Sequence, residues 1–404
     1  MTILVRDAED LIETNLRYHR AQGVDLFLIG DNGSTDRTLE ILEPYREAGL
    51  VELFHIEGDA RHAWSAGRTM LARKAHELGA DWVVHDDHDE FWWPLTGTLK
   101  DALAAIPERF GLASAPRTEF VARPGEEFWP ERLTVREAHF RRPPKIVHRT
   151  HPQVRIRQPH PVDIWIDHGT SPRDGLVGRP VRRAREAHSE ATELELLLAP
   201  NFSIGVLHFP VRSLKQYTRL VGLAVANGDL GRDEDTRRVR DAYRAGRLET
   251  IYREMAFDDD EIAGSIDAGH LEEDTGFRDY LRACPDPLSG EEGPGPLGDV
   301  LGWSQERRAR ELAELEADGM YTLSRYLQTI AYRRLSDRQL RAEARGAQER
   351  LQEIEATKWW RARPRYRFLT NPLRRAWRRW KRRSQGPNVT SDGNGTSPGD
   401  GTSP

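Results

Sequence analysis

Cysteine and long apolar segments are scarce in this chain of 404 residues. Its single cysteine, Cys284, excludes an internal disulfide framework and fits a reducing compartment. No apolar run approaches the roughly 18 residues that a membrane-spanning helix needs. The first strand-like run, Thr2–Val5, has neither the basic flank nor the cleavage site of a signal peptide beside it. We therefore expect a cytoplasmic protein without a membrane-spanning segment.

Charge is distributed unevenly along the sequence. Residues 358–383 contain 12 Lys or Arg and no acid, whereas the rest of the chain carries 48 basic and 65 acidic groups. Four tryptophans are interleaved with these arginines, at Trp359, Trp360, Trp377 and Trp380. This composition is typical of a helix lying on an anionic membrane, of a segment that binds nucleic acid, or of a solvated tail. Because no nucleic-acid fold motif accompanies it, we expect peripheral contact with the inner face of an anionic membrane and no nucleic-acid partner.

Short apolar runs alternate with amphipathic stretches over the first 95 residues. Four runs have the length and composition of buried strands, at Thr2–Val5, Asp25–Ile29, Val51–His55 and Asp81–His85. The stretches between them have helical spacing, and a glycine is placed to end each helix, at Gly23, Gly49 and Gly79. This alternation predicts an α/β fold with a mainly parallel sheet. Ligands of such sheets bind beyond the carboxyl ends of the strands.

An acidic segment follows the fourth run. Positions 85–90 read HDDHDE, which places four carboxylates and two histidines in six residues. Like charges this close repel one another unless a cation neutralises them. In an extended backbone Asp87 and Asp89 point the same way, as they would to hold a hard divalent cation on a diphosphate. We therefore predict Mn²⁺ or Mg²⁺ here; the alternative is a solvated acidic loop, which the flanking apolar residues and tryptophans disfavour.

Three short motifs occur in a fixed order over roughly the first 220 residues. They are DNGSTD at 31–36, DHDEF at 87–91 and HFPVRS at 208–213. In this order they resemble the glycosyltransferase family 2 group, and within it the branch with an NGSTD turn and a D-x-D-E-F metal motif. The resemblance implies a GT-A fold, a nucleotide-sugar donor with UDP as the expected nucleotide, a divalent metal on the diphosphate, and transfer with inversion at the anomeric carbon.

The resemblance also implies roles for individual residues. Asp87 and Asp89 would bind the metal and the donor ribose, Asp31 would contact the nucleoside, and His208 is a candidate further metal ligand. Asp86 departs from the family pattern, which has an apolar residue at that position. It either adds charge to the site or faces the opposite side of the strand.

Three further residues are donor-binding candidates because they follow predicted strands. Arg6 follows the first strand, and Asp59 and Arg61 follow the third, so all three belong to the same rim of the sheet. They would bind the base or a phosphate of the donor. For Asp59 and Arg61, placement on the surface without a role is the alternative.

An inverting transfer also needs a base that deprotonates the acceptor hydroxyl. The candidates lie in the region rich in arginine and histidine, and they are Glu119, Asp163, Asp167 and Glu186. Asp163 ranks first because it follows the turn that contains His160, and Glu119 is retained beside it. The sequence alone does not choose among them.

The chain divides into five predicted parts. They are a GT-A domain at 1–225, an acidic extension of helices and loops at 226–300, a long helical segment at 301–356, a basic aromatic tail at 357–385 and a disordered end at 386–404. The helical segment offers a surface through which an oligomer could form. The expected fold class is thus a GT-A α/β fold with a C-terminal helical extension and a basic tail.

The leading functional hypothesis is a metal-dependent glycosyltransferase that acts on a glycan or lipid-linked acceptor of the cell surface or envelope. A metal-dependent phosphoesterase or nucleotidyltransferase would use the same acids. A non-catalytic GT-A domain could instead act as a scaffold, although the intact Asp87 and Asp89 argue against that hypothesis.

Overall fold

The computed structural model describes residues 1–58, 60–108, 110–125, 127–156, 164–166, 198–199, 203–226, 228, 230 and 233–333. The predictions for 357–385 and 386–404 lie outside these residues, as do Asp59, His160, Asp163, Asp167 and Glu186. Arg61 lies in a helix, but its side chain is outside the described part. The division of the chain into five parts stays a prediction.

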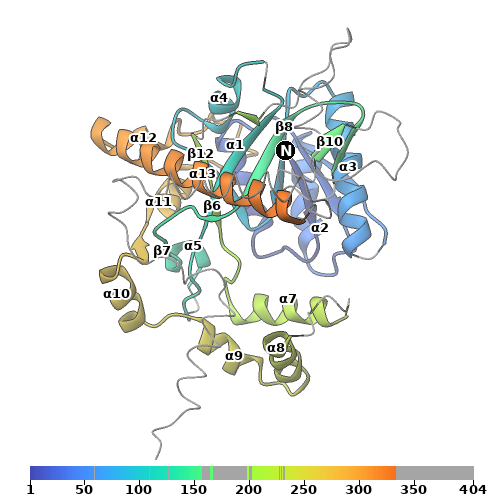
Figure 1. Cartoon of the computed structure of the whole chain (residues 1–404). Coiled ribbons are helices and arrows are strands. Elements are labelled where there is room, and N and C mark those ends of the chain that lie inside the picture. Colours follow the sequence, from blue (N-terminus) through green and yellow to red (C-terminus); the bar gives the residue numbers. More distant parts are fainter. Residues whose placement is uncertain are drawn as a thin grey trace, which may run out of the picture.

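The N-terminal third alternates strands and helices (Figure 1). The elements are β1 (Thr2–Val5), α1 (Ile12–Ala21), β2 (Phe27–Asp31), α2 (Thr38–Glu47), β3 (Val51–His55), α3 (Ala60–Glu77), β4 (Trp82–Asp87), β5 (Glu90–Pro94) and α4 (Leu99–Ala104). The three predicted glycine stops follow their helices with φ of 85°, 74° and 78°, which suits a residue without a Cβ.

Strands dominate the middle of the chain, and helices follow. The middle elements are β6 (Leu112–Glu119), α5 (Trp129–Arg132), β7 (Val135–Glu137), β8 (Arg142–Arg149), β9 (Val154–Ile156), β10 (Ile164–Ile166), β11 (Leu198–Ala199) and β12 (Ile204–His208). The later elements are α7 (Leu214–Ala226), α8 (Glu234–Arg244), α9 (Leu248–Met255), α10 (Asp259–Asp267), β13 (Leu271–Glu273), α11 (Gly276–Ala283), α12 (Leu297–Val300) and α13 (Gln305–Arg333). Among the described helices, none is long and apolar enough to cross a bilayer.

One large sheet organises these elements, with the strand order β3-β2-β1-β4-β8-β6-β12-β5 and β11 beside β6. Strands β1 to β4 are parallel to one another, and β12 is parallel to β6. Strand β8 runs antiparallel to both β4 and β6, and β5 runs antiparallel to β12. The predicted α/β fold with a mainly parallel sheet is confirmed.

The parallel block is buried on both faces, as strands with nearly continuous apolar residues require. On one face Leu4 and Leu28 pack with Leu71 of α3. On the other face the alternate residues Ile3 and Ile29 pack with residues of α1 and α2. The sheet is therefore fixed by apolar packing, and its carboxyl edge is left to polar residues.

Two strands extend further than predicted. The expected ends were Ile29 and His85, but β2 continues to Asp31 and β4 continues to Asp87. Asp31 pairs with Val5 in the ladder, and Asp87 pairs with Leu4. Both acids therefore belong to the sheet by their backbone pairing. Their side chains have polar partners at its edge.

Helices α7, α8 and α9 form a small unit at one side of the sheet (Figure 1). Its apolar centre contains Tyr217, Val221, Val239, Leu248, Ile251, Tyr252 and Met255. Helix α13 lies across β6 and β8. The sheet therefore has helices on more than one side, and α7 follows directly from the segment after β12.

Buried histidines predict a pH dependence of stability. His19 is fully buried, with Nδ1 3.1 Å from the carbonyl oxygen of Asn15 and Nε2 accepting a hydrogen bond from the backbone N–H of Trp92. Burial lowers the pKa of His19 to about 3, and that of the buried His148 to about 4. An unfolded histidine has a pKa of about 6.5, so the unfolded state binds more protons than the folded state below that pH.

The stabilising effect of these neutral histidines is therefore complete above pH 6.5 and declines as the pH falls toward 4 and 3. Each should contribute a slope of up to about 1.4 kcal/mol per pH unit in this range. Urea unfolding between pH 7 and pH 4 measures it. A His19→Gln variant should show a shallower dependence on pH, and an unchanged slope would contradict this assignment.

Candidate functional site

The carboxyl ends of β1, β2 and β4 meet at one edge of the sheet. The pairing of Val5 with Asp31 and of Leu4 with Asp87 places the two acids on either side of β1. Asp7 follows β1 in a left-handed conformation, with φ of 55°. We call this edge, with the segments that follow its strands, the rim.

Asp31 builds the turn that follows β2. Its carboxylate accepts hydrogen bonds from the backbone N–H groups of Gly33, at 3.0 Å, and Ser34, at 3.1 Å. Asp7 accepts from the N–H of Thr35 at 2.7 Å, and the Ser34 hydroxyl accepts from the N–H of Asp7 at 2.9 Å. These bonds fix the turn against the end of β1. The nucleoside contact of Asp31 stays a prediction, because the carboxylate already has backbone partners.

Asp86 faces away from the rim, which was one of the two alternatives for this position. Its carboxyl oxygens accept hydrogen bonds from Asn15 Nδ2 at 2.7 Å and from Trp92 Nε1 at 2.9 Å. Burial, together with the nearby Glu90, raises the pKa of Asp86 well above its usual range. The Asp86 side chain therefore does not take part in the ligand-facing side of the rim.

Asp87 and Glu90 are neutralised by side chains of the protein. Asp87 forms ion pairs with Lys145 and Arg68. Lys145 Nζ also lies 2.7 Å from a carboxylate oxygen of Glu90, which pairs with Arg117 at 2.7 Å. Burial opposes ionisation of Asp87, but Lys145 and Arg68 hold its pKa well below the usual range. The cation facing this acid is thus Lys145 together with Arg68.

Asp89 lies beside His208. His208 Nε2 is 3.5 Å from Asp89 Oδ2, and Arg212 Nη1 is 3.8 Å from the same oxygen. Burial alone would raise the pKa of Asp89, but His208 and the nearby cations hold it well below its usual range. Burial would lower the pKa of His208, but Asp89 and Glu119 outweigh it and raise the pKa to about 9.

Glu119 is also part of this cluster, because β6 and β12 end side by side. Its Oε1 is 3.3 Å from His208 Nδ1, and its Oε2 is 2.5 Å from Arg142. Burial opposes ionisation, yet His208 and Arg142 lower the pKa of Glu119 to about 2. A carboxylate with so low a pKa is a weak general base, since proton affinity falls with pKa. The other base candidates, led by Asp163, lie outside the described residues.

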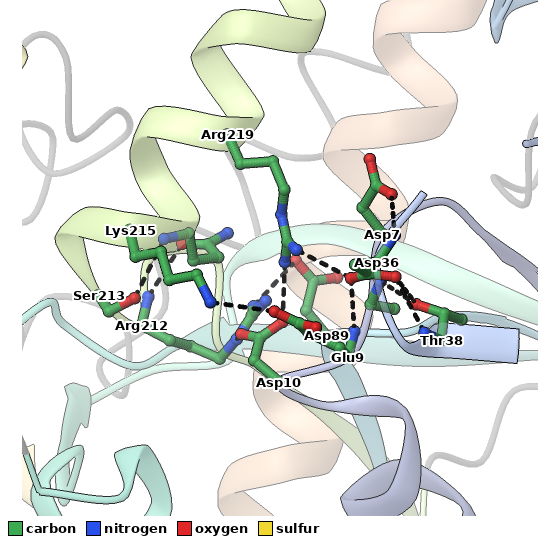
Figure 2. A network of polar contacts seen from close by, with 12 residues as sticks. Asp7, Glu9, Asp10, Asp36, Thr38, Asp89, Arg212, Ser213, Lys215 and Arg219 are labelled. Carbon is green, nitrogen blue, oxygen red and sulfur yellow. Dashed lines mark hydrogen bonds and ion pairs between the residues drawn. The ribbon is translucent and has the colours of Figure 1, made fainter. Parts of the chain in front are cut away.

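An ionic network connects the rim to α7 (Figure 2). Arg212 donates to Asp10 at 3.0 Å, and Arg219 donates to Asp10 at 3.1 Å and to Asp36 at 2.9 Å. Lys215 donates to Glu9 at 3.0 Å. Three separate segments, after β1, before α2 and at the start of α7, are thereby held together.

Sequence reasoning missed most of these partners. They are Asp10, Arg68, Arg117, Arg142, Lys145 and Arg219. Arg212 stands in the HFPVRS motif, which could have identified it. For Lys145 no local signal exists, because its partners are set by the antiparallel pairing of β4 with β8 and of β6 with β8.

Arg6 follows β1 at the rim and is half-buried. Its Nε is buried and has no hydrogen-bond partner within the described part of the chain. A guanidinium whose buried N–H lacks a partner is suited to an anionic ligand. The side chain therefore fits the predicted donor-binding role, which stays a prediction.

Two residues of the rim fit a divalent cation. Among the described residues, no group of three or more His, Cys, Asp or Glu is arranged to hold a metal by itself. A cation bound to a diphosphate, however, needs only one or two protein ligands, because phosphate oxygens supply others. Asp89 and His208 present an oxygen and a nitrogen 3.5 Å apart. Asp87 would have to release Lys145 or Arg68 to become a ligand.

Neither a protein-family model nor a curated protein matches the chain. Solved structures of S. aureus TarS align with it. TarS 1–349 in complex with UDP is 13% identical, with 79% of this chain and 89% of that chain covered and a TM-score of 0.29. TarS 1–349 in complex with UDP-GlcNAc is 21% identical over 31% of this chain and 34% of that chain, with a TM-score of 0.21. A further TarS structure is 21% identical, with a TM-score of 0.25. The alignment covers 31% of this chain and only 22% of that TarS chain. Similarity at this level identifies no family.

The buried ion pairs predict a large cost for removing Lys145. A Lys145→Met variant removes the cation that Asp87 and Glu90 share and leaves each acid with one arginine, in surroundings where incomplete neutralisation of a charge is costly. We expect the free energy of unfolding to fall by about 3–5 kcal/mol, measured by urea denaturation.

The matched control is Lys100→Met. Lys100 pairs with Asp25 at 2.6 Å, but both side chains are exposed. Because exposed pairs contribute little, this variant should lose far less stability. Equal losses in the two variants would contradict the assignment of Lys145 as the counter-charge of the buried acids.

Proposed function

We propose that the chain is a metal-dependent inverting glycosyltransferase that moves a sugar from a nucleotide-sugar, with UDP as the expected nucleotide, to a glycan or lipid-linked acceptor. The observation that carries the proposal is the pair of Asp89 and His208, 3.5 Å apart at the carboxyl edge of a GT-A-like sheet. This edge is where α/β sheets bind nucleotides. The motif resemblance found in the sequence points to the same residues.

In this proposal, different residues of the rim bind different parts of the donor. Asp89 and His208 would hold Mn²⁺ or Mg²⁺, which supplies positive charge to the leaving diphosphate. Arg6 offers a buried N–H to a phosphate oxygen. The turn built by Asp31 and Asp7 forms the wall against which the nucleoside would lie.

The acceptor side needs a base that deprotonates the acceptor hydroxyl. Glu119 is held ionised by His208 and Arg142 and is a poor proton acceptor. Asp163 therefore remains the proposed base. A chain that only hydrolysed its donor, or exchanged pyrophosphate, would belong to the phosphoesterase or nucleotidyltransferase alternative.

An Asp89→Asn variant tests the metal site. It removes a charged oxygen ligand while keeping the size of the side chain, so Mn²⁺-dependent binding of UDP should weaken about tenfold or more. Calorimetry with UDP in the presence and absence of Mn²⁺ measures this. A panel of sugar nucleotides, tested for release of the nucleotide, then identifies the donor.

The matched control is Asp86→Asn, the same substitution three positions earlier. Asp86 faces Asn15 and Trp92 on the opposite side of the strand, so UDP affinity should stay unchanged. If Asp89→Asn binds UDP and Mn²⁺ as tightly as the wild type, the metal assignment is wrong.

We also propose that residues 357–385 bring the protein to an anionic membrane. Support comes from the 12 basic residues and four tryptophans of this segment, since each Lys or Arg near an anionic surface contributes about 1 kcal/mol before screening. Removing residues 358–404 should release the protein from vesicles that contain phosphatidylserine and leave UDP binding intact. Equal co-sedimentation of the full and shortened chains would refute this proposal.

A further inference from the structure

We propose that Glu119 is a positioning residue: it holds the imidazole of His208 so that Nε2 faces Asp89 and the cation proposed there. The metal in this statement rests on the proposed function, whereas the hold of Glu119 on the ring does not. This role differs from the one expected for Glu119 from the sequence, where it was a candidate base, and that expectation stays a prediction.

The register of three strands creates the contact. His208 ends β12, where it pairs with Glu119 of β6 on one side and with Glu90 of β5 on the other. The N–H of Phe120 donates to the carbonyl oxygen of His208 at 2.9 Å, so the two strand ends are joined by their backbones as well. Glu119 and His208 therefore stand side by side on the same edge, and side-chain flexibility is not needed to bring them together.

Glu119 is itself held in place. Arg142 lies 2.5 Å from its Oε2, which leaves Oε1 to face His208 Nδ1 at 3.3 Å. Arg142 also pairs with Glu137 at 2.9 Å, so the guanidinium is anchored on a second carboxylate. The side chains of all three residues are about one-eighth exposed, at 12% each. A carboxylate fixed in this way can fix the ring that it contacts.

The contact between Glu119 and His208 determines which ring nitrogen of His208 carries the hydrogen. An ionised carboxylate only accepts hydrogen bonds, so Nδ1 must carry the hydrogen that it shares with Glu119. In the neutral ring the lone pair is then on Nε2, which lies 3.5 Å from Asp89 Oδ2. In the protonated ring, Nε2–H and Asp89 form an ion pair, and a metal cation that takes the place of this proton would be bound by both groups. A carboxylate behind a metal-binding histidine typically strengthens metal affinity 10–100-fold.

The experiment compares three variants of the full chain, with Mn²⁺ in the presence of saturating UDP as the probe. Glu119→Gln removes the charge that orients the ring, His208→Ala removes the ring, and Glu137→Gln is the matched control. Glu137 accepts hydrogen bonds from Arg142, the arginine that also holds Glu119. It therefore controls for a change at the arginine that leaves the contact between Glu119 and His208 in place. Mn²⁺ affinity is followed by electron paramagnetic resonance, and the tautomer of His208 by ¹⁵N NMR of the metal-free protein with its ring neutral.

We expect the wild type and Glu137→Gln to carry the hydrogen on Nδ1 and to bind Mn²⁺ alike. Glu119→Gln should lose the preference for the Nδ1–H tautomer and bind Mn²⁺ about 10–100-fold more weakly. A merely structural role of Glu119 would not move the ring tautomer.

Two results would overturn the proposal, and they differ. If His208→Ala weakens Mn²⁺ binding but Glu119→Gln changes neither affinity nor tautomer, Glu119 does not position the ring, and the metal site stands. If His208→Ala leaves Mn²⁺ affinity unchanged, the metal site of the proposed function is wrong, and Glu119 has no cation to position His208 for.

Discussion

The neutralisation of buried acids by Lys145 is the interaction on which the rest of the site depends. The β4–β5 segment brings Glu90 into the interior and leaves Asp87 partly buried, where an unpaired carboxylate would be protonated or would destabilise the fold. Lys145 lies between the two acids because β8 is inserted beside β4. Arg68 and Arg117 complete the balance from α3 and β6. The order of strands in the sheet therefore determines which cations neutralise these acids.

This balance decides how much charge the rim presents to a ligand. The number of acids in the HDDHDE segment suggests a strongly negative edge, but the acids differ in orientation and in their ionic partners. Asp86 is hydrogen-bonded on the far side of the strand, and Asp87 is held by two cations. Asp89 faces His208, whose raised pKa reflects two carboxylates around one ring. A donor diphosphate would thus meet nearly balanced charge, and a divalent cation beside Asp89 would tip it toward the positive side.

The sequence predicted the fold class and the rim because both follow from local patterns. Strands β1 and β3 have the predicted bounds, and periodicity identified the helices between them. Strands β2 and β4 ended too early in the prediction, since polarity at Asp31 and Asp87 was read as the start of a loop. The counter-charges could not be predicted: Lys145 is 58 residues from Asp87, and only the antiparallel pairing of β8 joins them. Glu119 was found as a residue of interest, but its partners, and with them its role, came from the register of β6 and β12.

The segment after β12 links the candidate site to the outlying helices. It begins with His208 beside Asp89, continues through Arg212 and enters α7, where Arg219 bridges Asp10 and Asp36 (Figure 2). Helices α7 to α9 pack around their own apolar centre. The contacts described between α7 and the rim are ion pairs. Ionic contacts between partly exposed groups weaken with salt and compete with anionic ligands. Arg219 of α7 and Arg212 share Asp10 as a partner, and Arg212 Nη1 lies 3.8 Å from Asp89 Oδ2, so α7 is connected to the acid of the candidate site through a chain of ion pairs.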